Sequence, residues 1–268
     1  MKKLTIIALV LIMAVTSVFA GGSKEKADNS LEYITKKGTF VLGLDDSFPP
    51  MGYRNENNEI VGFDVDVARE VCKRLGVQLV LQPIDWNAKE QELNSKQIDC
   101  IWNGFTVTEE RRKNLTFSES YVANAQVVVV LDKSNYKTLA DLAGKTVGLQ
   151  AGSSAADAVE DTPEFKKSVK GIVEFKDNLT ALMDLEIGGC DAVVMDLLVA
   201  NYAIGQSSVK MRILSESLSP EEYAVGFRLG ELKLADAVNT QMKAMVADGS
   251  MAKIATEWFG ADITIIGK

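Results

Sequence analysis

The segment from Ile98 to Arg112 joins a short apolar run to polar residues that could bind a small anion. The run stops at the small-residue turn Asn103-Gly104, and the hydroxyl of Thr106 and the guanidinium of Arg111 follow. Backbone N–H groups, a hydroxyl and a guanidinium at the end of a strand favour a receptor for a carboxylate. The alternative is a solvated arginine after an ordinary strand.

A helix is predicted to begin after Thr108, because threonine is a preferred N-cap and the acids Glu109 and Glu110 follow it. Acids gain from the positive end of a helix dipole, whereas Arg111, in the same turn, gains nothing from it. An arginine at this position indicates a partner elsewhere.

Residues 1–20 have the composition of a secretory signal peptide. Lys2 and Lys3 precede an apolar stretch at 4–15, which is too short for a comfortable membrane span, and Ala20 ends a segment typical of a cleavage site. We expect cleavage after Ala20, a flexible leader at 21–30, and a periplasmic or other extracytoplasmic location. An uncleaved anchor helix is the alternative, and the lack of a following cysteine disfavours a lipid anchor.

The composition excludes several classes of function. The chain of 268 residues has a formal net charge of −8, and 37 acids face 27 basic residues once Lys2 and Lys3 are removed. Such a chain repels phosphate backbones, so we expect no nucleic-acid partner. It has no histidine, which excludes Ser–His–Asp and Cys–His catalysis and most zinc sites. We expect neither a metal nor a cofactor.

The three cysteines, Cys72, Cys100 and Cys190, lie in apolar surroundings without metal-binding spacing. We interpret them as small buried hydrophobic residues. A disulfide between Cys72 and Cys100 is an open alternative, because a helix that carries one could pack on a strand that carries the other.

Strand and helix patterns alternate along the chain, which indicates an α/β protein with parallel sheets. An apolar stripe predicts a helix at 63–75 that ends at Gly76, and we interpret Asp64 and Asp66 in its first turn as structural. Residues 38–44 resemble 144–149, so two similar α/β halves are expected. Other predicted elements are strands at 39–44, 98–102, 126–131, 145–149, 190–195 and 223–228, and helices at 232–246 and 251–259.

The chain resembles a known family, the bacterial periplasmic binding proteins for polar amino acids, which are the third family of extracellular solute-binding proteins of ABC importers. The resemblance covers residues 39–260. It rests on Asp45-Asp46-Ser47-Phe48-Pro49-Pro50, Gly62-Phe63-Asp64-Val65-Asp66, Ile98-Asp99, Thr106-Val107-Thr108-Glu109-Glu110-Arg111, Phe117-Ser118 with Tyr121, and Glu257-Trp258-Phe259-Gly260.

The resemblance implies a two-lobe periplasmic-binding-protein fold of type II, or Venus flytrap, with two crossover hinge strands. Lobe 1 would be discontinuous, with residues 31–121 and 226–268, and lobe 2 would comprise 126–221. The hinge would consist of 122–125 and 222–225, where a few residues absorb the closing motion. We expect a monomer.

The resemblance also assigns roles to the residues after the strand at 98–102. Arg111 matches an arginine that pairs with the ligand α-carboxylate, which a guanidinium fork fits and which agrees with its unusual position. Thr106 matches a hydroxyl at the charged end of the ligand. Gly104 matches a main-chain contact, and Asn103 beside it completes the predicted turn of the site.

Residues of the second half of the chain would also bind the charged groups of the ligand. Asp196 matches the carboxylate that pairs with the ligand α-ammonium, although it could serve only as an N-cap for the helix from Leu197. Ser153 and Ser154 match a loop whose N–H groups and hydroxyls reach the α-carboxylate. The alternative for Ser154 is a helix cap.

Four more residues would hold the ligand side chain. Phe48 and Trp86 match aromatic positions that enclose it, Asp45 matches an acid that reads its far end, and Gln150 matches a position that varies with specificity. The alternatives are a packed turn at Phe48, a surface lid or core anchor at Trp86, and an ordinary turn acid at Asp45.

These roles predict an extracytoplasmic receptor that binds a free polar L-amino acid and delivers it to the permease subunits of an ABC importer. Asp45 favours a basic or amide side chain and disfavours acidic ones, while cystine-like ligands stay open. We expect a protein that is not an enzyme. The alternatives are a dehydratase-like enzyme on the same fold and a sensory ligand-binding ectodomain.

Overall fold

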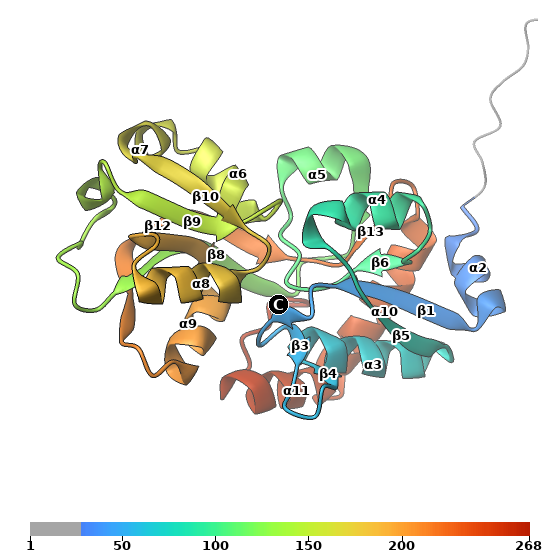
Figure 1. Ribbon diagram of the computed structural model, residues 1–268. Coiled ribbons are helices and arrows are strands. Elements are labelled where there is room, and N and C mark those ends of the chain that lie inside the picture. Colours follow the sequence, from blue (N-terminus) through green and yellow to red (C-terminus); the bar gives the residue numbers. More distant parts are fainter. Residues whose placement is uncertain (1–27) are drawn as a thin grey trace, which may run out of the picture.

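The computed structural model describes residues 28–268, which fold into two lobes around separate five-stranded sheets (Figure 1). The predicted two-lobe α/β fold is therefore confirmed. The expected signal peptide at 1–20 and most of the expected leader lie outside the described residues. The last part of that leader differs from expectation, because Asp28 Oδ2 accepts from Lys233 N at 2.6 Å and Ser30 Oγ accepts from Leu234 N at 3.1 Å.

The sheet of lobe 1 has the order β5-β1-β6-β13-β7, and β13 runs antiparallel to both of its neighbours. The predicted strand at 98–102 is shorter than expected, but Asp99 N to Val41 O and Trp102 N to Gly43 O extend its pairing on both sides. The strands are β1 (Thr39–Leu44), β5 (Gln78–Pro83), β6 (Cys100–Ile101), β7 (Leu115–Phe117) and β13 (Gly226–Arg228), with a side sheet of β2 (Ser47–Phe48), β3 (Gly52–Arg54) and β4 (Ile60–Val61).

The helices of lobe 1 include the predicted α3 (Phe63–Leu75), whose buried stripe contains Val67 and Val71. It ends at Gly76, as predicted, and the φ of +71° at this residue suits glycine. The other helices are α2 (Ser30–Lys37), η1 (Trp86–Ala88), α4 (Lys89–Asn94), α5 (Glu109–Asn114), α10 (Leu232–Ala247) and α11 (Ser250–Phe259).

The sheet of lobe 2 has the order β10-β9-β11-β8-β12, and β8 runs antiparallel to β11 and β12. Its strands are β8 (Val122–Leu131), β9 (Thr146–Gln150), β10 (Gly171–Phe175), β11 (Ala192–Asp196) and β12 (Met211–Tyr223). Its helices are η2 (Leu139–Leu142), α6 (Ser154–Glu160), α7 (Pro163–Ser168), α8 (Asn178–Ile187) and α9 (Leu197–Gln206).

The chain passes between the lobes twice, from β7 to β8 and from β12 to β13, and these passages lie side by side. Val122 pairs with Tyr223 and Asn124 with Glu221, so the predicted hinge segments form one antiparallel ribbon. The predicted strand at 223–228 is divided, because Ala224 and Val225 connect β12 to β13. The carboxyl ends of the parallel strands of both sheets face each other beside this ribbon.

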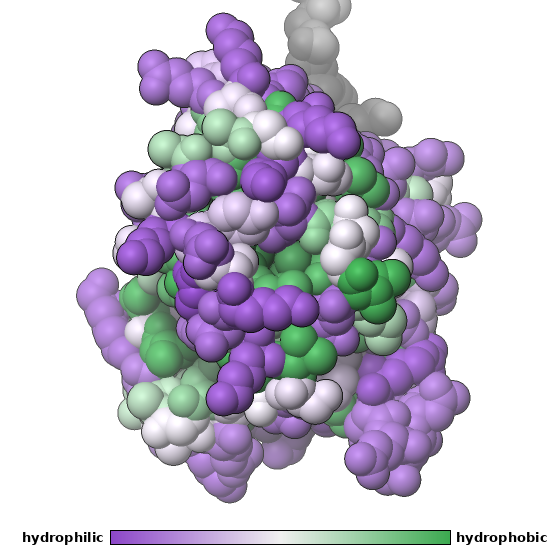
Figure 2. Space-filling view, turned by 60° about the vertical axis from the view of Figure 1, so that its left-hand side comes forward, coloured by the Kyte–Doolittle hydropathy of each residue, from purple (hydrophilic) through white to green (hydrophobic). Residues whose placement is uncertain are grey.

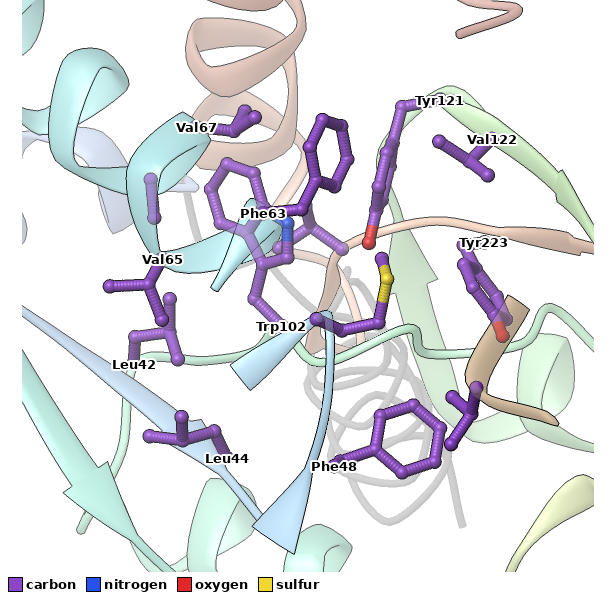
Figure 3. Packing of buried hydrophobic residues seen from close by; sticks show 14 of the residues in the cluster. Leu42, Leu44, Phe48, Phe63, Val65, Val67, Trp102, Tyr121, Val122 and Tyr223 are labelled. Carbon is purple, nitrogen blue, oxygen red and sulfur yellow. The ribbon is translucent and has the colours of Figure 1, made fainter. Parts of the chain in front are cut away.

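An aromatic cluster in lobe 1 packs next to the crossing ribbon. The rings of Phe63 and Trp102 each lie 6.3 Å from the ring of Tyr121, and all three are fully buried (Figure 3). Aromatic pairs at this separation contribute beyond the area that they bury. The cluster therefore anchors the start of the crossing to the lobe 1 core.

The surface is mainly hydrophilic on the face drawn in Figure 2, and the hydrophobic residues that reach it form groups among hydrophilic ones. Across residues 28–268, no helix combines the length and apolar character that a membrane span requires. The structure gives no disulfide between Cys72 and Cys100, so that alternative was wrong. Both thiols are free and buried, as is that of Cys190.

Buried charges join the strand ends of lobe 1. Asp99 Oδ2 accepts from Lys37 Nζ at 2.6 Å and from Val41 N at 2.7 Å, while Arg228 Nη2 lies 3.8 Å from Asp99 Oδ1. Arg228 Nη1 also donates to the carbonyl of Ile98 at 2.8 Å. A buried charge that loses its counter-ion is strongly destabilising, so Asp99 holds β1, β6 and β13 together.

We predict that Asp99→Ala lowers the free energy of unfolding by about 3 kcal/mol, because Lys37 and Arg228 lose a shared anion. Asp132→Ala is the control, since Asp132 forms an exposed ion contact of 3.8 Å with Arg212, and its loss should cost under about 1 kcal/mol. Urea denaturation measures both values. Equal losses in the two variants would contradict the assignment.

Candidate ligand-binding site

A small cavity lies between the lobes at the carboxyl ends of their parallel strands. Its free volume is about 10 Å³, room for no more than a water molecule, so a ligand fits only when the lining side chains move apart. Every residue that lines it belongs to the set predicted from the sequence. The lining residues are Phe48, Trp86, Gly104, Thr106, Arg111, Gln150, Ser153, Ser154 and Asp196.

Arg111 presents a buried cation to this cavity from the first turn of α5. The predicted N-cap is confirmed, because Thr108 Oγ1 accepts from Arg111 N at 3.2 Å. Arg111 Nη1 donates to Thr106 O at 2.8 Å, and Nη2 lies 3.9 Å from Asp157 Oδ2 of lobe 2. Burial lowers the pKa of the guanidinium. These contacts fix the fork while leaving donor capacity for an anion.

Asp196 presents a buried carboxylate from lobe 2, at the end of β11. It stands at the N-cap position of α9 but makes no side-chain cap hydrogen bond, which argues against the capping alternative. Its Oδ1 accepts instead from Tyr223 OH at 2.7 Å and from Asn124 Nδ2 at 2.8 Å. The crossing ribbon therefore orients this carboxylate.

Glu221 is a second carboxylate beside the cavity, and the sequence did not reveal it. Its Oε2 accepts from Thr106 Oγ1 at 3.0 Å, Gln126 Nε2 at 3.0 Å and Asn124 Nδ2 at 3.2 Å. Asn124 thus donates to both Asp196 and Glu221. The only sequence signal for Glu221 is an acid pair, Glu221-Glu222, before the predicted strand at 223–228.

The two carboxylates raise each other's cost of ionisation. Burial, and next the charge of Glu221, raise the pKa of Asp196 to about 7. Burial likewise raises the pKa of Glu221. Two close carboxylates favour a shared proton or a cation between them. The lobe 2 side of the cavity therefore favours a positively charged group.

The aromatic side chains form walls of the cavity and also belong to the core, so neither role excludes the other. Trp86 packs edge-on against Phe105, with ring centroids 5.8 Å apart. Phe48 lies so close to Gly104 that a Cβ on this glycine would stand 2.9 Å from the Phe48 ring. Gly104 also has a φ of +55°, which suits glycine. The predicted turn therefore requires glycine for two reasons.

Asp45 and Gln150 meet across the interface of the lobes. Gln150 Nε2 donates to Asp45 Oδ2 at 2.7 Å, and Asp45 Oδ1 accepts from Ser47 N at 2.9 Å. Burial raises the pKa of Asp45 to about 6, against the hydrogen bond from Gln150. Asp45 does not itself line the cavity, whereas its partner Gln150 does.

Asn103 does not line the cavity, in contrast to its predicted place in the site. Its Oδ1 accepts from Asp45 N at 3.0 Å, so it joins the ends of β1 and β6. Asp64, interpreted as structural, supports the site directly, because its Oδ2 accepts from Gly104 N at 2.6 Å. Burial raises the pKa of Asp64 to about 7. A helix-start acid thus fixes the turn that follows β6.

The lobes contact each other on both sides of the cavity. Lys89 Nζ of lobe 1 donates to Gly152 O of lobe 2 at 2.8 Å, and burial lowers its pKa to about 8. On the other side, Tyr202 OH of α9 donates to Tyr53 OH of β3 at 3.1 Å. The sequence did not reveal Lys89, because a lysine at a helix start is typical of a solvated surface.

Ser153 and Ser154 stand where β9 leads into α6. Ser153 Oγ donates to Gln150 O at 2.8 Å and makes no cap hydrogen bond. Ser154 Oγ donates to Thr106 Oγ1 at 3.1 Å, which joins the lobes through two predicted hydroxyls. The structure thus brings the predicted polar groups of both halves into direct contact.

Known proteins resemble this chain over almost its whole length. The L-cystine-binding protein TcyJ of Escherichia coli (strain K12) is 31% identical over 263 residues, which cover 96% of each chain. The ABC transporter arginine-binding protein 1 of the same strain is 28% identical, over 97% of this chain and 99% of that protein.

A solved structure agrees with the sequence comparisons. A substrate-binding protein of an ABC uptake transporter from Streptococcus pneumoniae, with bound histidine, has a TM-score of 0.86 and 35% identity. The match covers 89% of this chain and 98% of that one. The sequence model of the bacterial extracellular solute-binding proteins, family 3, matches residues 40–261, so the chain belongs to this family.

Proposed function

We propose that the protein binds a free polar L-amino acid in the cavity and delivers it to the permease of an ABC importer. The observation that carries this proposal is the pair of opposite charges that the two lobes present to one small cavity. Arg111 comes from lobe 1 and Asp196 from lobe 2. An α-amino acid carries the matching carboxylate and ammonium, so it contacts both lobes at once.

The same geometry links binding to closure. We propose that 122–125 and 222–225 act as the hinge between lobe 1, with 31–121 and 226–268, and lobe 2, with 126–221. A ligand that contacts Arg111 and Asp196 together stabilises the closed form, because the open form offers these contacts separately. Charge-assisted hydrogen bonds contribute about 1.5–3 kcal/mol each, so four or five of them, less the costs of ordering, leave roughly micromolar affinity.

The lean toward a basic or amide side chain rests on Asp45 and Gln150. Both supply oxygen acceptors near the end of the cavity, and the acid repels a ligand carboxylate. Relatives named for arginine and histidine binding support this lean, and the relative named for L-cystine supports a polar ligand in general. We propose that the protein acts as an extracytoplasmic monomer.

We propose a binding protein in preference to a dehydratase-like enzyme or a sensory ectodomain. The named relatives are binding proteins, and the hydrogen bonds to Asp196 hold it as a fixed acceptor for an amine. Thermal shift with each of the twenty amino acids and L-cystine tests the choice, since a ligand of the folded state raises the melting temperature. No shift, together with turnover of a cyclic acid, would establish the enzyme; shifts without association with a permease would favour the sensor.

We predict that Arg111→Ala weakens amino-acid binding by about 10²–10³-fold, because a bidentate charge-assisted contact to the α-carboxylate is lost. Arg112→Ala, which removes the same charge from an exposed neighbour, should bind like the wild type. Isothermal titration calorimetry measures both affinities. Wild-type affinity in Arg111→Ala would refute the assignment.

We predict that Asp196→Asn weakens binding of amino acids by at least about 10-fold but leaves analogues without the α-amine nearly unaffected. The neutral amide keeps the shape of the side chain and loses the charge that pairs with the ammonium. Competition titrations with L-glutamine and glutaramic acid provide the comparison. If both ligands lost the same factor, Asp196 would be a structural residue.

We predict that Asp45→Asn weakens binding of L-arginine by about 10-fold at pH 7.5, while L-glutamine changes little. In the wild type, the preference for L-arginine over L-glutamine should fall from pH 7.5 to 5, because the pKa of Asp45 is raised to about 6 and its protonated form cannot pair with a guanidinium. The ratio of the two affinities removes any shared effect of Asp196. Asp46→Asn is the control, and an unchanged ratio in Asp45→Asn would remove Asp45 from the site.

A further inference from the structure

We propose that Glu221 is the second anion of the ammonium subsite and that it orients the hydroxyls of Thr106 and Ser154 so that they accept from the ligand. This inference rests on the proposed function, since it places the α-ammonium at Asp196. Glu221 lies on the crossing ribbon and belongs to neither set of parallel strand ends. Its Oε2 nevertheless contacts Thr106 and Ser154, which both line the cavity.

The direction of the hydrogen bonds around Glu221 supports this role. Gln126 Nε2 donates to Ser154 Oγ at 3.2 Å, Ser154 Oγ donates to Thr106 Oγ1 at 3.1 Å, and Thr106 Oγ1 donates to Glu221 Oε2 at 3.0 Å. An ionised carboxylate only accepts, so each hydroxyl proton points toward Glu221. A hydroxyl that already donates its one hydrogen bond can only accept from a ligand. It therefore suits an ammonium and not a carboxylate.

This chain of donors changes the role expected for Ser154. Its hydroxyl has two acceptors here, Thr106 Oγ1 at 3.1 Å and Glu221 Oε2 at 3.4 Å, and we infer that its proton is used by them and not by the α-carboxylate. Thr106 then has one lone pair left for the ligand, after the bond from Ser154. Thr106, Asp196 and Glu221 together form an acceptor side of the cavity, opposite the donor Arg111.

The charges around the subsite give it a net preference for a cation. Glu221 and Asp196 share the Asn124 amide, and Tyr223 OH donates to Asp196. Arg111 is the positive group that interacts with both acids. The charges of Asp157 and Glu90 also stabilise its positive form. Lys89, the next cation, acts on Arg111 by repulsion. A ligand carboxylate that engages Arg111 leaves the two acids to the ligand ammonium.

The test compares Glu221→Gln with Glu222→Gln, which removes the same charge from the next residue, an exposed one on the opposite face of the ribbon. The first measurement is the melting temperature without any ligand. The charge of Glu221 contributes to the raised pKa of Asp196, so at pH 8, above that pKa of about 7, Glu221→Gln should melt about 2–4 °C higher than the wild type. At pH 5 Asp196, with its pKa of about 7, holds a proton, and the gain should disappear.

This pH dependence follows from linkage. A carboxyl with a raised pKa in the folded state holds a proton that the unfolded state has already released, so stability falls as the pH rises from about 4 to 7. Glu221→Gln removes the part of the raised pKa of Asp196 that comes from charge repulsion. The decrease in stability with rising pH should therefore be smaller in this variant. Glu222→Gln should follow the wild-type curve.

The second measurement uses amino acids and their analogues without the α-amine. The probes are L-arginine, L-histidine and L-glutamine, paired with 5-guanidinopentanoic acid, imidazolepropionic acid and glutaramic acid. Glu221→Gln should weaken the amine-bearing member of each bound pair by about 10-fold and leave its analogue within about twofold.

The outcomes separate this inference from the proposed function. The inference would be overturned if ligand-free Glu221→Gln melted at a lower temperature and lost equal affinity for both members of a pair. Glu221 would then have only a structural role. If no amino acid stabilised the wild type, the proposed function would fail. In that case a higher melting temperature of Glu221→Gln at pH 8 would still support a two-anion subsite, and its absence would overturn the subsite as well.

Discussion

The antiparallel pairing of the two crossing segments is the constraint on which the rest of the structure depends. Val122 pairs with Tyr223 and Asn124 with Glu221, which brings the carboxyl ends of two separate sheets toward one gap. Parallel strands place the residues that follow them at one edge of a sheet. The ribbon therefore brings two sets of loop residues, distant in the sequence, together as the walls of a single cavity.

The cavity is polar although it is buried, and its polar groups are largely satisfied by one another. Burial of a charge is costly unless partners compensate it. Here the carbonyl of Thr106 accepts from Arg111, and its hydroxyl donates to Glu221. The amide of Asn124 donates to both Asp196 and Glu221. Contacts between the lobes, such as Gln150 to Asp45, occupy groups that a ligand can take over. A ligand between the lobes therefore replaces some of their direct hydrogen bonds with its own contacts to both lobes.

Several residues serve the fold and the site at once. Trp86 packs on Phe105 and lines the cavity, and Asp64 lies in the first turn of α3 while it accepts a hydrogen bond from Gly104 N. Rigid core contacts limit the movement of such groups, which preserves the geometry of the site. The aromatic cluster of Phe63, Trp102 and Tyr121 extends this rigidity to the start of the crossing ribbon.

Local patterns in the sequence determined the helix after Thr108, the end of α3 at Gly76, the alternation of strands and helices, and the residue types at the strand ends. Each depends on neighbours within a few positions, so it is readable without the fold. Only the tertiary structure decided that Asn103 supports Asp45, that Asp64 holds Gly104, and that Glu221 reaches Thr106 across 115 positions of the chain. These contacts depend on strand pairing between distant segments, and the local pattern of an acid near a strand is the same whether it faces solvent or a buried cavity.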